Sequence, residues 1–390
     1  MRTQPWYVHY AANDLDSARL LLKERLKEHE DELPTLLYYA ETLRRLKKHA
    51  AADSVADKAL SLDPNSGFAL RIKGGLRDAQ FTGTDSVSGR DSSVYYYRKA
   101  IEVDPDDCVT WELLWIAAME EGDSAGERSA LRHLHSCGIY TQTAYAYARW
   151  LLGLLPDSAV LITNGDMDTY PLRVLQVAER FRPDVAVVNV SLLNLESYYR
   201  YVCRYHGIPM AFADDELGEI EHRLNDGEVE TIAEQFVSGW IDLASRGQLD
   251  RPLCAAITVS RRLLPEELTQ RLSLKGPYYL LADTLDMYGD PETLEAAVRF
   301  VDVDKLSGPF ISDKIVSPLL LNVKNKRPLD ANFVATALYA ALGYQKAQRP
   351  DKAVEMLDWA EAYLEAVGNE HSEMADKLQL MRTRIVGDAQ

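Results

Sequence analysis

The stretch LPTLLYYAETLRRLKKHAAADSVADKALSLDPNS, residues 33–66, decides the fold of the N-terminal part of the chain. Apolar residues recur at helical spacing along its first half, alanines recur along its second half, and Pro64 follows. Antiparallel helices approach closely where side chains are small, and a proline ends a helix. The segment therefore predicts a close-packed helical hairpin. The positions that carry the pattern are Leu36, Tyr39, Ala40, Leu43, Ala52, Ala56 and Ala59.

The same pattern returns further along the chain, which indicates a repeat. YYYRKAIEVDP (95–105) repeats the logic of SVADKALSLDP (54–64), with Ala100 in the place of Ala59. Helical pairs with a period of about 34 residues are typical of tetratricopeptide repeats. The second unit is longer than the first, and we expect its insertion within the polar residues 81–93. A third unit spans 106–138, and 14–30 resembles the second helix of an earlier one. Residues 1–155 are predicted to form a tetratricopeptide-like helical solenoid.

A similar hairpin is predicted at the C-terminus, in residues 330–390. With Val334 as its first position, small residues again fall where two helices must approach. Solenoids of this type usually bind peptides or proteins on one face. The leading prediction is therefore a non-catalytic scaffold with a protein or peptide partner. The alternative is a helical wrapper that only supports the middle of the chain.

The middle of the chain predicts an α/β domain, residues 156–290, followed by a connecting segment, 291–329. Apolar runs at 158–163 and 185–191 flank the helical segment PLRVLQVAERF, which gives a βαβ unit. Such buried strands indicate a small Rossmann-like parallel sheet. The predicted fold class is thus α/β with flanking helical regions. Further strands are expected at 207–212, 252–259 and 277–282, and further helices at 194–206, 228–246 and 265–271.

Composition narrows the classes of protein and of partner. The chain has 390 residues and a formal net charge of −17. Such an acidic chain is a poor candidate for binding nucleic acid. It contains no apolar segment of membrane-spanning length and no signal-peptide pattern, so we expect no direct membrane insertion. Its four cysteines form no closely spaced pair. We therefore expect free thiols and a cytoplasmic location.

One loop could carry chemistry, because it follows the first predicted strand and opens a helix. Ligands of open α/β sheets bind at the carboxyl ends of strands, and helix amides favour anions. Asp166 and Asp168 could hold Mg²⁺ or Mn²⁺ that bridges to a phosphate. Arg173 or Arg182 could pair with that phosphate. The remaining candidate ligand-binding residues are Asn164, Gly165, Thr169, Tyr170, Asn189, Ser191 and Asn194.

The same loop has a plainer interpretation. Asn-Gly-Asp is ordinary turn chemistry, and Asp168 or Thr169 can cap a helix whose first turn contains Pro171. The histidines are isolated or badly spaced, so no residue is predicted to be catalytic. The alternative function is a metal-assisted nucleotide or sugar-phosphate binding enzyme that uses the Asp166 and Asp168 loop.

The segment LPDSAVLITNGDMDTYPLRVLQVAERFRPDVAVVNVSLLN resembles a block of large bacterial multi-spanning membrane proteins. These are similar to the protein O-mannosyltransferase superfamily, and the block lies in their soluble C-terminal region. RPLCAAITVS and LKGPYYLLAD add to the resemblance, which covers about residues 150–367. It implies a link to cell-envelope glycosylation and a membrane glycosyltransferase complex as partner. The membrane domain expected to carry the family's catalytic carboxylate has no counterpart here, so mannosyl transfer is not implied.

Overall fold

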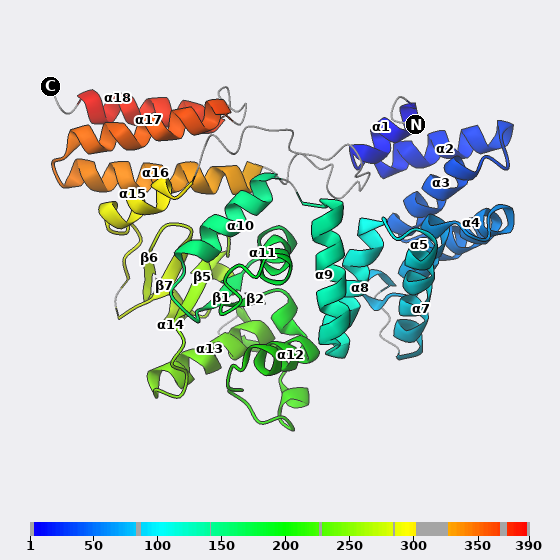
Figure 1. Cartoon of the computed structure of the whole chain (residues 1–390), viewed down its shortest axis with the longest axis horizontal. Helices are drawn as coiled ribbons and strands as arrows, with labels where there is room; N and C mark the ends of the chain where they lie inside the picture. The colour runs from blue at the N-terminus through cyan, green and yellow to red at the C-terminus, as the bar shows by residue number, and fades with distance from the viewer. Residues whose placement is uncertain are drawn as a thin grey trace. The chain divides into compact units, whose positions relative to one another are not determined.

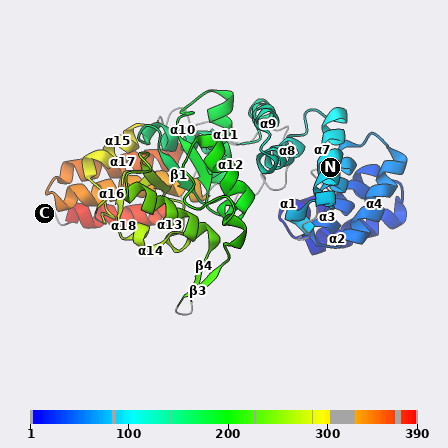
Figure 2. The same ribbon diagram turned by 90° about the horizontal axis from the view of Figure 1, so that it is seen from below.

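The computed structural model describes residues 4–387, except 83–86, 141, 226–227, 284, 302–326 and 367–372. The chain divides into two compact units. Unit 1 contains the chain up to Ile139, and unit 2 contains the chain from Tyr140 together with the C-terminal helices. Figures 1 and 2 show both units in two views. Among the described residues, no helix is long and apolar enough to cross a membrane.

Unit 1 consists of helical hairpins, as predicted. Helices α3 and α4 form the hairpin of residues 33–66, and each of the other predicted units also contains a helix pair. A short pair, α1 and α2, precedes them. The helices are α1 (Pro5–Ala11), α2 (Leu15–Glu28), α3 (Leu33–Arg45), α4 (His49–Leu62), α5 (Gly67–Gly75), α6 (Ala79–Thr82), α7 (Val87–Val103), α8 (Cys108–Glu121) and α9 (Ser124–Cys137).

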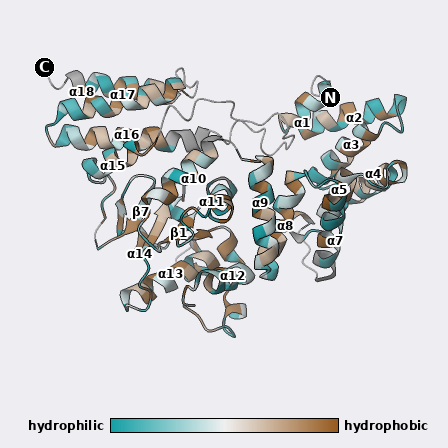
Figure 3. Ribbon diagram, viewed as in Figure 1, coloured by the Kyte–Doolittle hydropathy of each residue, from teal (hydrophilic) through white to brown (hydrophobic). Residues whose placement is uncertain are grey.

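Alanines of α4 hold neighbouring hairpins together. Ala59 packs with Leu36 of α3 and Ala69 of α5, so one small residue serves both its own hairpin and the next. Ala56 does the same one turn earlier, with Ala40 and Ile72. All of these alanines are fully buried. Apolar and polar residues alternate along most of these helices, as Figure 3 shows. The predicted helical solenoid is therefore confirmed.

The loop expected at residues 81–93 is shorter than predicted. Helix α7 begins at Val87, so the second half of the polar segment is helical, while residues 83–86 lie outside the described part. The serines and glycine of this segment have low helix propensity, but Ser93 and Val94 are buried in the hairpin. Tertiary packing therefore overrides local propensity here.

The expectation of four free thiols is wrong for two of the cysteines. Cys108, the first residue of α8, forms a disulfide with Cys137, the last residue of α9, and their Cα atoms are 6.2 Å apart. The hairpin brings its two ends together, which the sequence spacing does not show. Cys203 and Cys254 are free and buried. The cysteine content therefore no longer supports a reducing compartment.

Unit 2 contains a sheet domain and the C-terminal helices. Helix α10 leads into the predicted βαβ unit, which consists of β1, α11 and β2. The helices and strands of unit 2 are α10 (Gln142–Leu154), β1 (Val160–Thr163), α11 (Asp166–Ala178), β2 (Ala186–Asn189), α12 (Glu196–His206), β3 (Arg223–Asn225), β4 (Glu228–Glu230), α13 (Ile232–Ser245), β5 (Leu253–Ala256), α14 (Glu266–Thr269), β6 (Leu272–Leu274), β7 (Tyr278–Leu281), α15 (Pro291–Arg299), α16 (Arg327–Lys346), α17 (Pro350–Ala366) and α18 (Glu373–Gly387).

The main sheet is mixed, in the order β2-β1-β5-β7-β6. Strand β1 pairs in parallel with both β2 and β5, as expected, with Val160 opposite Ala186 and Leu253. Strand β7 is antiparallel to both of its neighbours, β5 and β6, and the sequence did not predict β6. The connection between β6 and β7 is short and passes through Gly276 (φ 108°), which explains why these two strands are antiparallel. A parallel neighbour needs a long crossover, whereas a tight turn gives an antiparallel pair.

Two further predictions for unit 2 need correction. Residues 207–212 form no strand; Gly207 has a φ of 64° and Pro209 lacks an amide hydrogen. The helix expected from 228 starts at Ile232. The hydroxyl of Thr231 caps it by accepting from the Glu234 N–H at 3.1 Å. Residues 228–230 form β4, which pairs with β3 in a hairpin that projects from the body of unit 2 in Figure 2.

The C-terminal helices pack on the sheet domain through α10. The Trp150 indole donates to the Ala297 carbonyl of α15 at 2.7 Å, and its ring lies 4.6 Å from that of Phe333 in α16. Helices α16 and α17 form the predicted close-packed hairpin, with Ala337, Ala341 and Ala353 fully buried. Most of the predicted connecting segment, residues 302–326, lies outside the described residues.

Candidate functional site

The candidate site lies at the carboxyl edge of the sheet, where the chain changes direction. From β1 the chain passes to β2 on one side and later to β5 on the other. The loops that follow β1 and β5 therefore flank a topological switch point, where open α/β sheets bind ligands. The loop after β1 is the one that the sequence singled out, and the loop after β5 contains Thr258.

Asp168 organises this edge as a buried helix cap. Its carboxylate accepts the N–H of Gly165 at 2.8 Å and the N–H of Asn164 at 3.0 Å. It also accepts the hydroxyl of Thr258 from the loop after β5. Both carboxylate oxygens are thus engaged with protein donors. The helix starts earlier than the capping interpretation of the sequence predicted, at Asp166, so Asp168 is its third residue and Pro171 lies beyond its first turn. From there Asp168 reaches back to the N–H of Gly165, the N-cap residue, and joins the two loops of the switch point.

The surroundings of Asp168 are buried and polar. Burial raises the pKa of Asp168, while hydrogen bonds from Thr258 and from the Asn164 and Gly165 amides oppose this rise. Tyr147 of α10, fully buried, brings its hydroxyl close to Asp168 and Thr258, and burial raises its pKa as well. Tyr147 was missed from the sequence because a tyrosine among alanines in a helix resembles ordinary core packing.

The loop after β2 reaches the same edge. The Ser191 hydroxyl donates to the Asn164 carbonyl at 3.1 Å, which ties this loop to the loop after β1. The side-chain oxygen of Asn189 accepts the Ser191 N–H at 2.9 Å. Asn194 is engaged elsewhere, since its side-chain oxygen accepts the Ala233 N–H at the start of α13. The structure therefore brings Asn189 and Ser191 to the candidate loop and makes Asn194 a link to α13.

The side-chain amide nitrogen of Asn189 has no hydrogen-bond partner among the described residues, although it is buried. Asn189 is the register partner of Thr163, so both side chains point to the same face of the sheet. Thr163 shares a 2.6 Å hydrogen bond with Thr169 of α11. The unpaired amide thus lies on the face that carries the start of α11, and an unpaired buried donor is costly.

The first turn of α11 leaves room beside its backbone. Gly165 is extended (φ −160°), and a Cβ added there would meet no atom within 4 Å. Neither backbone strain nor packing among the described residues therefore requires a glycine. Asp166 is exposed at the first helical position and accepts a hydrogen bond from Tyr170. Open helix amides next to free space can receive an anionic group.

The two predicted phosphate-binding arginines lie away from this edge. Arg173 is buried, donates to the side chain of Gln176 at 2.7 Å and stacks over the Tyr205 ring. Arg182 precedes β2, so it lies at the amino edge of the sheet. Its guanidinium donates to the carbonyls of Leu152 and Leu155 at the end of α10. The structure therefore does not bring these arginines to the candidate loop.

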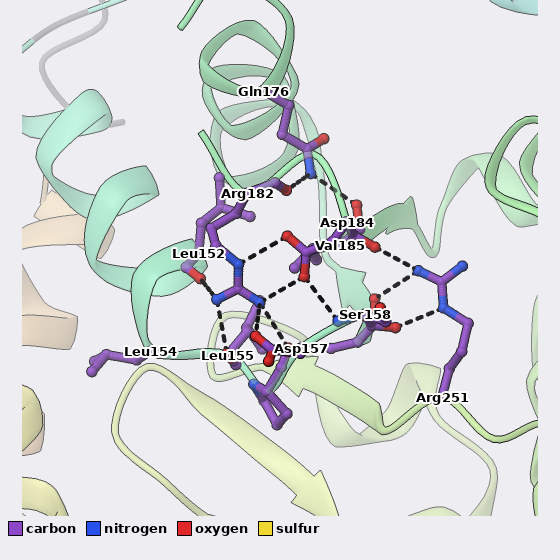
Figure 4. A network of polar contacts seen from close by, with 12 residues as sticks. Leu152, Leu154, Leu155, Asp157, Ser158, Gln176, Arg182, Asp184, Val185 and Arg251 are labelled. Carbon is purple, nitrogen blue, oxygen red and sulfur yellow. Dashed lines mark hydrogen bonds and ion pairs between the residues drawn. The ribbon is translucent and has the colours of Figure 1, made fainter. Parts of the chain in front are cut away.

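Arg182 belongs to a network that fastens the amino edge of the sheet (Figure 4). It forms a two-pronged ion pair with Asp184, with N···O distances of 3.0 and 2.9 Å. This hydrogen bond is the main reason that the pKa of Asp184 falls to about 2. Arg251 donates to the carbonyls of Ser158 and Asp184 on the other side. The Arg-Pro-Asp segment of the resemblance therefore has a structural role.

The predicted metal ligands do not form a complete cation site by themselves. Asp166 and Asp168 are both at the start of α11, but the oxygens of Asp168 already accept three hydrogen bonds. In the described part of the chain, no three His, Cys, Asp or Glu side chains are grouped to hold a metal. A divalent cation here would need oxygens from its ligand, as Mg²⁺ commonly uses those of phosphates.

Residues 144–216 are similar to a domain family described as TMEM260-associated domain 2. The match runs from α10 through the βαβ unit to α12, so it contains the loops after β1 and β2. It covers a minority of the chain. No curated protein matches the sequence. A solved structure described as Naa15/Naa10 bound to HypK-THB aligns with 97% of this chain and 67% of its own, at 11% identity and a TM-score of 0.28. A TM-score this low does not establish a common fold.

Proposed function

We propose that this chain is a non-catalytic scaffold whose unit 1 binds a protein partner. The observation that supports this most is the packing of the first helices of successive hairpins. Helices α3 and α5 contact one another directly, and Arg44 of α3 lies against Gly75 of α5. We call the half-buried polar residues that α3 and α5 carry, Glu41, Arg44, Arg45 and Arg71, the first-helix face; it extends over two successive repeats. Stacked repeats of this kind present an extended surface to a partner.

Affinity purification of the tagged full-length chain from native extract tests this proposal. We expect at least one protein to be enriched, by quantitative mass spectrometry, above a control with the tag alone. If extracts from several growth conditions yield no enriched protein, the scaffold proposal is wrong.

The resemblance of the middle block, together with the similarity of residues 144–216 to TMEM260-associated domain 2, supports a membrane glycosyltransferase complex as the partner. The same purification from detergent-solubilised membranes tests this more specific proposal. It predicts a multi-spanning glycosyltransferase among the enriched proteins. Partners found only in the membrane-free extract would contradict it.

A second candidate function is favoured by the buried, unpaired amide of Asn189. We propose that the carboxyl edge of the sheet binds a small anionic ligand such as a nucleotide or sugar phosphate. The unpaired donor and the open space at Gly165 support this. The exposed Asp166 would repel a bare anion, so a phosphate accompanied by Mg²⁺ or Mn²⁺ suits the edge better.

A thermal-shift screen with nucleotides and nucleotide sugars, each with and without Mg²⁺, tests this second candidate. A ligand that binds the native state raises the melting temperature by mass action. The shift should disappear in Gly165→Val, which fills the open space, and in Asp166→Ala. Gly218→Ala, for which the nearest side-chain atom is 3.7 Å away, is the matched control and should keep the shift. Equal shifts in all variants would contradict a site at this edge.

A further inference from the structure

Three arginines gather on the first-helix face of unit 1, and we call them the arginine cluster: Arg44, Arg45 and Arg71. Each guanidinium lies over an aromatic ring. Arg44 lies 4.6 Å from the centre of the Phe81 ring, Arg45 lies 5.1 Å from Tyr10, and Arg71 lies 4.5 Å from Phe68. Stacking fixes the planes of the guanidinium groups and leaves their N–H edges for hydrogen bonds. In a chain with a net charge of −17, this is a local concentration of positive charge.

Two of the three arginines have an anionic partner. Arg44 binds Glu41 through two N–H groups, both at 2.8 Å. Arg71 binds the carboxylate of Asp107 at 2.6 and 2.7 Å. Burial raises the pKa of Glu41, but the charges of the three arginines outweigh this effect and lower it. Glu41 thus contacts Arg44 directly, and the charges of Arg71 and Arg45 act on it as well.

Arg45 is the arginine without a carboxylate. It donates to the neutral side chain of Asn13 at 2.6 Å, and the part of the chain that the structure describes places no acidic group within ion-pair distance of it. One of its terminal nitrogens is buried without a geometric hydrogen bond there, beside Tyr10, which also interacts with the guanidinium group. Two carboxylates, those of Glu41 and Asp107, lie within ion-pair distance of the cluster, and Asp104 acts on Arg71 from further away. A half-buried cation whose neighbours are a neutral amide and a tyrosine gains more from an added carboxylate than an exposed one does.

We infer that the arginine cluster binds an acidic segment of a protein partner, and that a side-chain carboxylate of this segment pairs with Arg45. This inference rests on the proposed scaffold function. A carboxylate supplies the missing charge and matches the planar fork of the guanidinium. The location on the first-helix face puts the cluster where stacked repeats receive peptides. The rest of the chain is negatively charged and repels acidic peptides. An acidic peptide that binds the chain is therefore expected to bind at the arginine cluster.

Fluorescence polarisation with labelled ten-residue peptides and the full-length chain tests the inference. The probe alternates glutamate and aspartate and has an amidated C-terminus; its match contains glutamine and asparagine instead. We expect the acidic probe to bind and the neutral one to bind at least tenfold more weakly, with affinity falling between 50 and 300 mM salt. Binding of the two probes with equal affinity, or of neither, would overturn the inference. Binding only when the C-terminal carboxylate is free would do so as well.

The variant Arg45→Gln should weaken binding of the acidic probe about tenfold or more, because it removes a charge-assisted hydrogen bond. Arg98→Gln is the matched control, since Arg98 is an exposed arginine of the second helix α7 in the same unit. It should leave the affinity unchanged, and both variants should keep the circular dichroism spectrum. Equal losses in the two variants would show a non-specific charge effect and overturn the inference.

Capture of a partner from native extract by Arg45→Gln and by the unchanged chain separates failure of this inference from failure of the scaffold proposal. If native extract yields a partner that Arg45→Gln captures as well as the unchanged chain does, unit 1 binds proteins but not through this carboxylate pairing. If no partner is captured by either chain, the scaffold proposal itself fails.

Discussion

At the scale of single residues, Asp168 shows what a sequence motif can and cannot reveal. Its spacing after the first strand allowed both a helix cap and a ligand-binding carboxylate. The structure shows that two backbone N–H groups and the Thr258 hydroxyl occupy its oxygens. Thr258 lies 90 residues further along the chain, so local spacing alone could not identify this contact. Asp166, two residues earlier, remains exposed.

The two aspartates therefore make a matched pair for mutation. Asp168→Ala leaves the backbone N–H groups of Asn164 and Gly165 and the hydroxyl of Thr258 without their acceptor. It should reduce the free energy of unfolding of unit 2 by about 1–3 kcal/mol. Asp166→Ala should change it by less than about 0.5 kcal/mol. Urea unfolding followed by circular dichroism measures both. Equal effects would show that Asp168 is not the cap of α11.

The partners of Arg182 in the structure differ from the phosphate that the sequence predicted. Arg182 was predicted to pair with a phosphate, but its partners are the carbonyls at the end of α10 and the carboxylate of Asp184. The sequence places an arginine and an aspartate next to a strand. It does not show that a preceding helix ends against them.

This ion pair predicts a dependence of stability on acid. The folded state holds the pKa of Asp184 at about 2, below its ordinary value of 3.8, so the folded state binds fewer protons than the unfolded state. The stabilisation is present above about pH 4 and is lost as the pH falls towards 2. Asp184→Asn should lower the stability of unit 2 at pH 7. The difference between variant and unchanged chain should shrink from pH 4 to pH 2 in urea unfolding experiments. A constant difference would contradict the assignment.

At the scale of elements, periodicity predicted most helices and the βαβ unit, because their spacing and apolar runs are local properties. It failed for β6, for the start of α13 and for residues 207–212. Strand β6 is three residues long and pairs through a tight turn, so its pattern is too short to detect. The start of α13 depends on a reciprocal pair of hydrogen bonds between Thr231 and Glu234.

The alanine packing between hairpins can be tested with two substitutions in one helix. Ala56→Leu inserts bulk where α3, α4 and α5 meet, so it should destabilise unit 1 by about 1–3 kcal/mol. Ala51→Leu adds the same bulk to an exposed position of α4 and should have little effect. Thermal unfolding followed by circular dichroism separates the two. If Ala51→Leu is as damaging as Ala56→Leu, the hairpins do not pack as described.

The disulfide of the α8–α9 hairpin makes an element-scale prediction as well. Closing a loop between Cys108 and Cys137 stabilises the hairpin by about 3.6 kcal/mol in the chain-entropy account. A reducing agent should therefore lower the melting temperature of the chain and leave Cys108→Ser unaffected. Mass spectrometry after alkylation under denaturing conditions should find two free thiols before reduction and four after it. Four free thiols in the untreated protein would contradict the disulfide.

At the scale of the whole molecule, the sequence predicted helical repeats, a central sheet domain and a C-terminal hairpin, all of which the structure contains. It did not predict that α10 and α16 pack together, because Trp150 and Phe333 are far apart in the chain. The convergence of polar groups at the carboxyl edge follows from strand order, which only the structure supplies. The arginine cluster of unit 1 was not predicted either, because net charge says nothing of how α3 and α5 bring their arginines together.

If the first-helix face of unit 1 binds a protein partner, that partner must lie close to α3. Site-specific photo-crosslinking in native extract tests it most directly, with a benzophenone amino acid in place of Leu37 of α3 or of Leu62 of α4. Both are leucines of the same hairpin, one on its first helix and one on its second. We expect a crosslinked partner from position 37 and none from position 62. Crosslinking from position 62 alone, or from neither position, would contradict it.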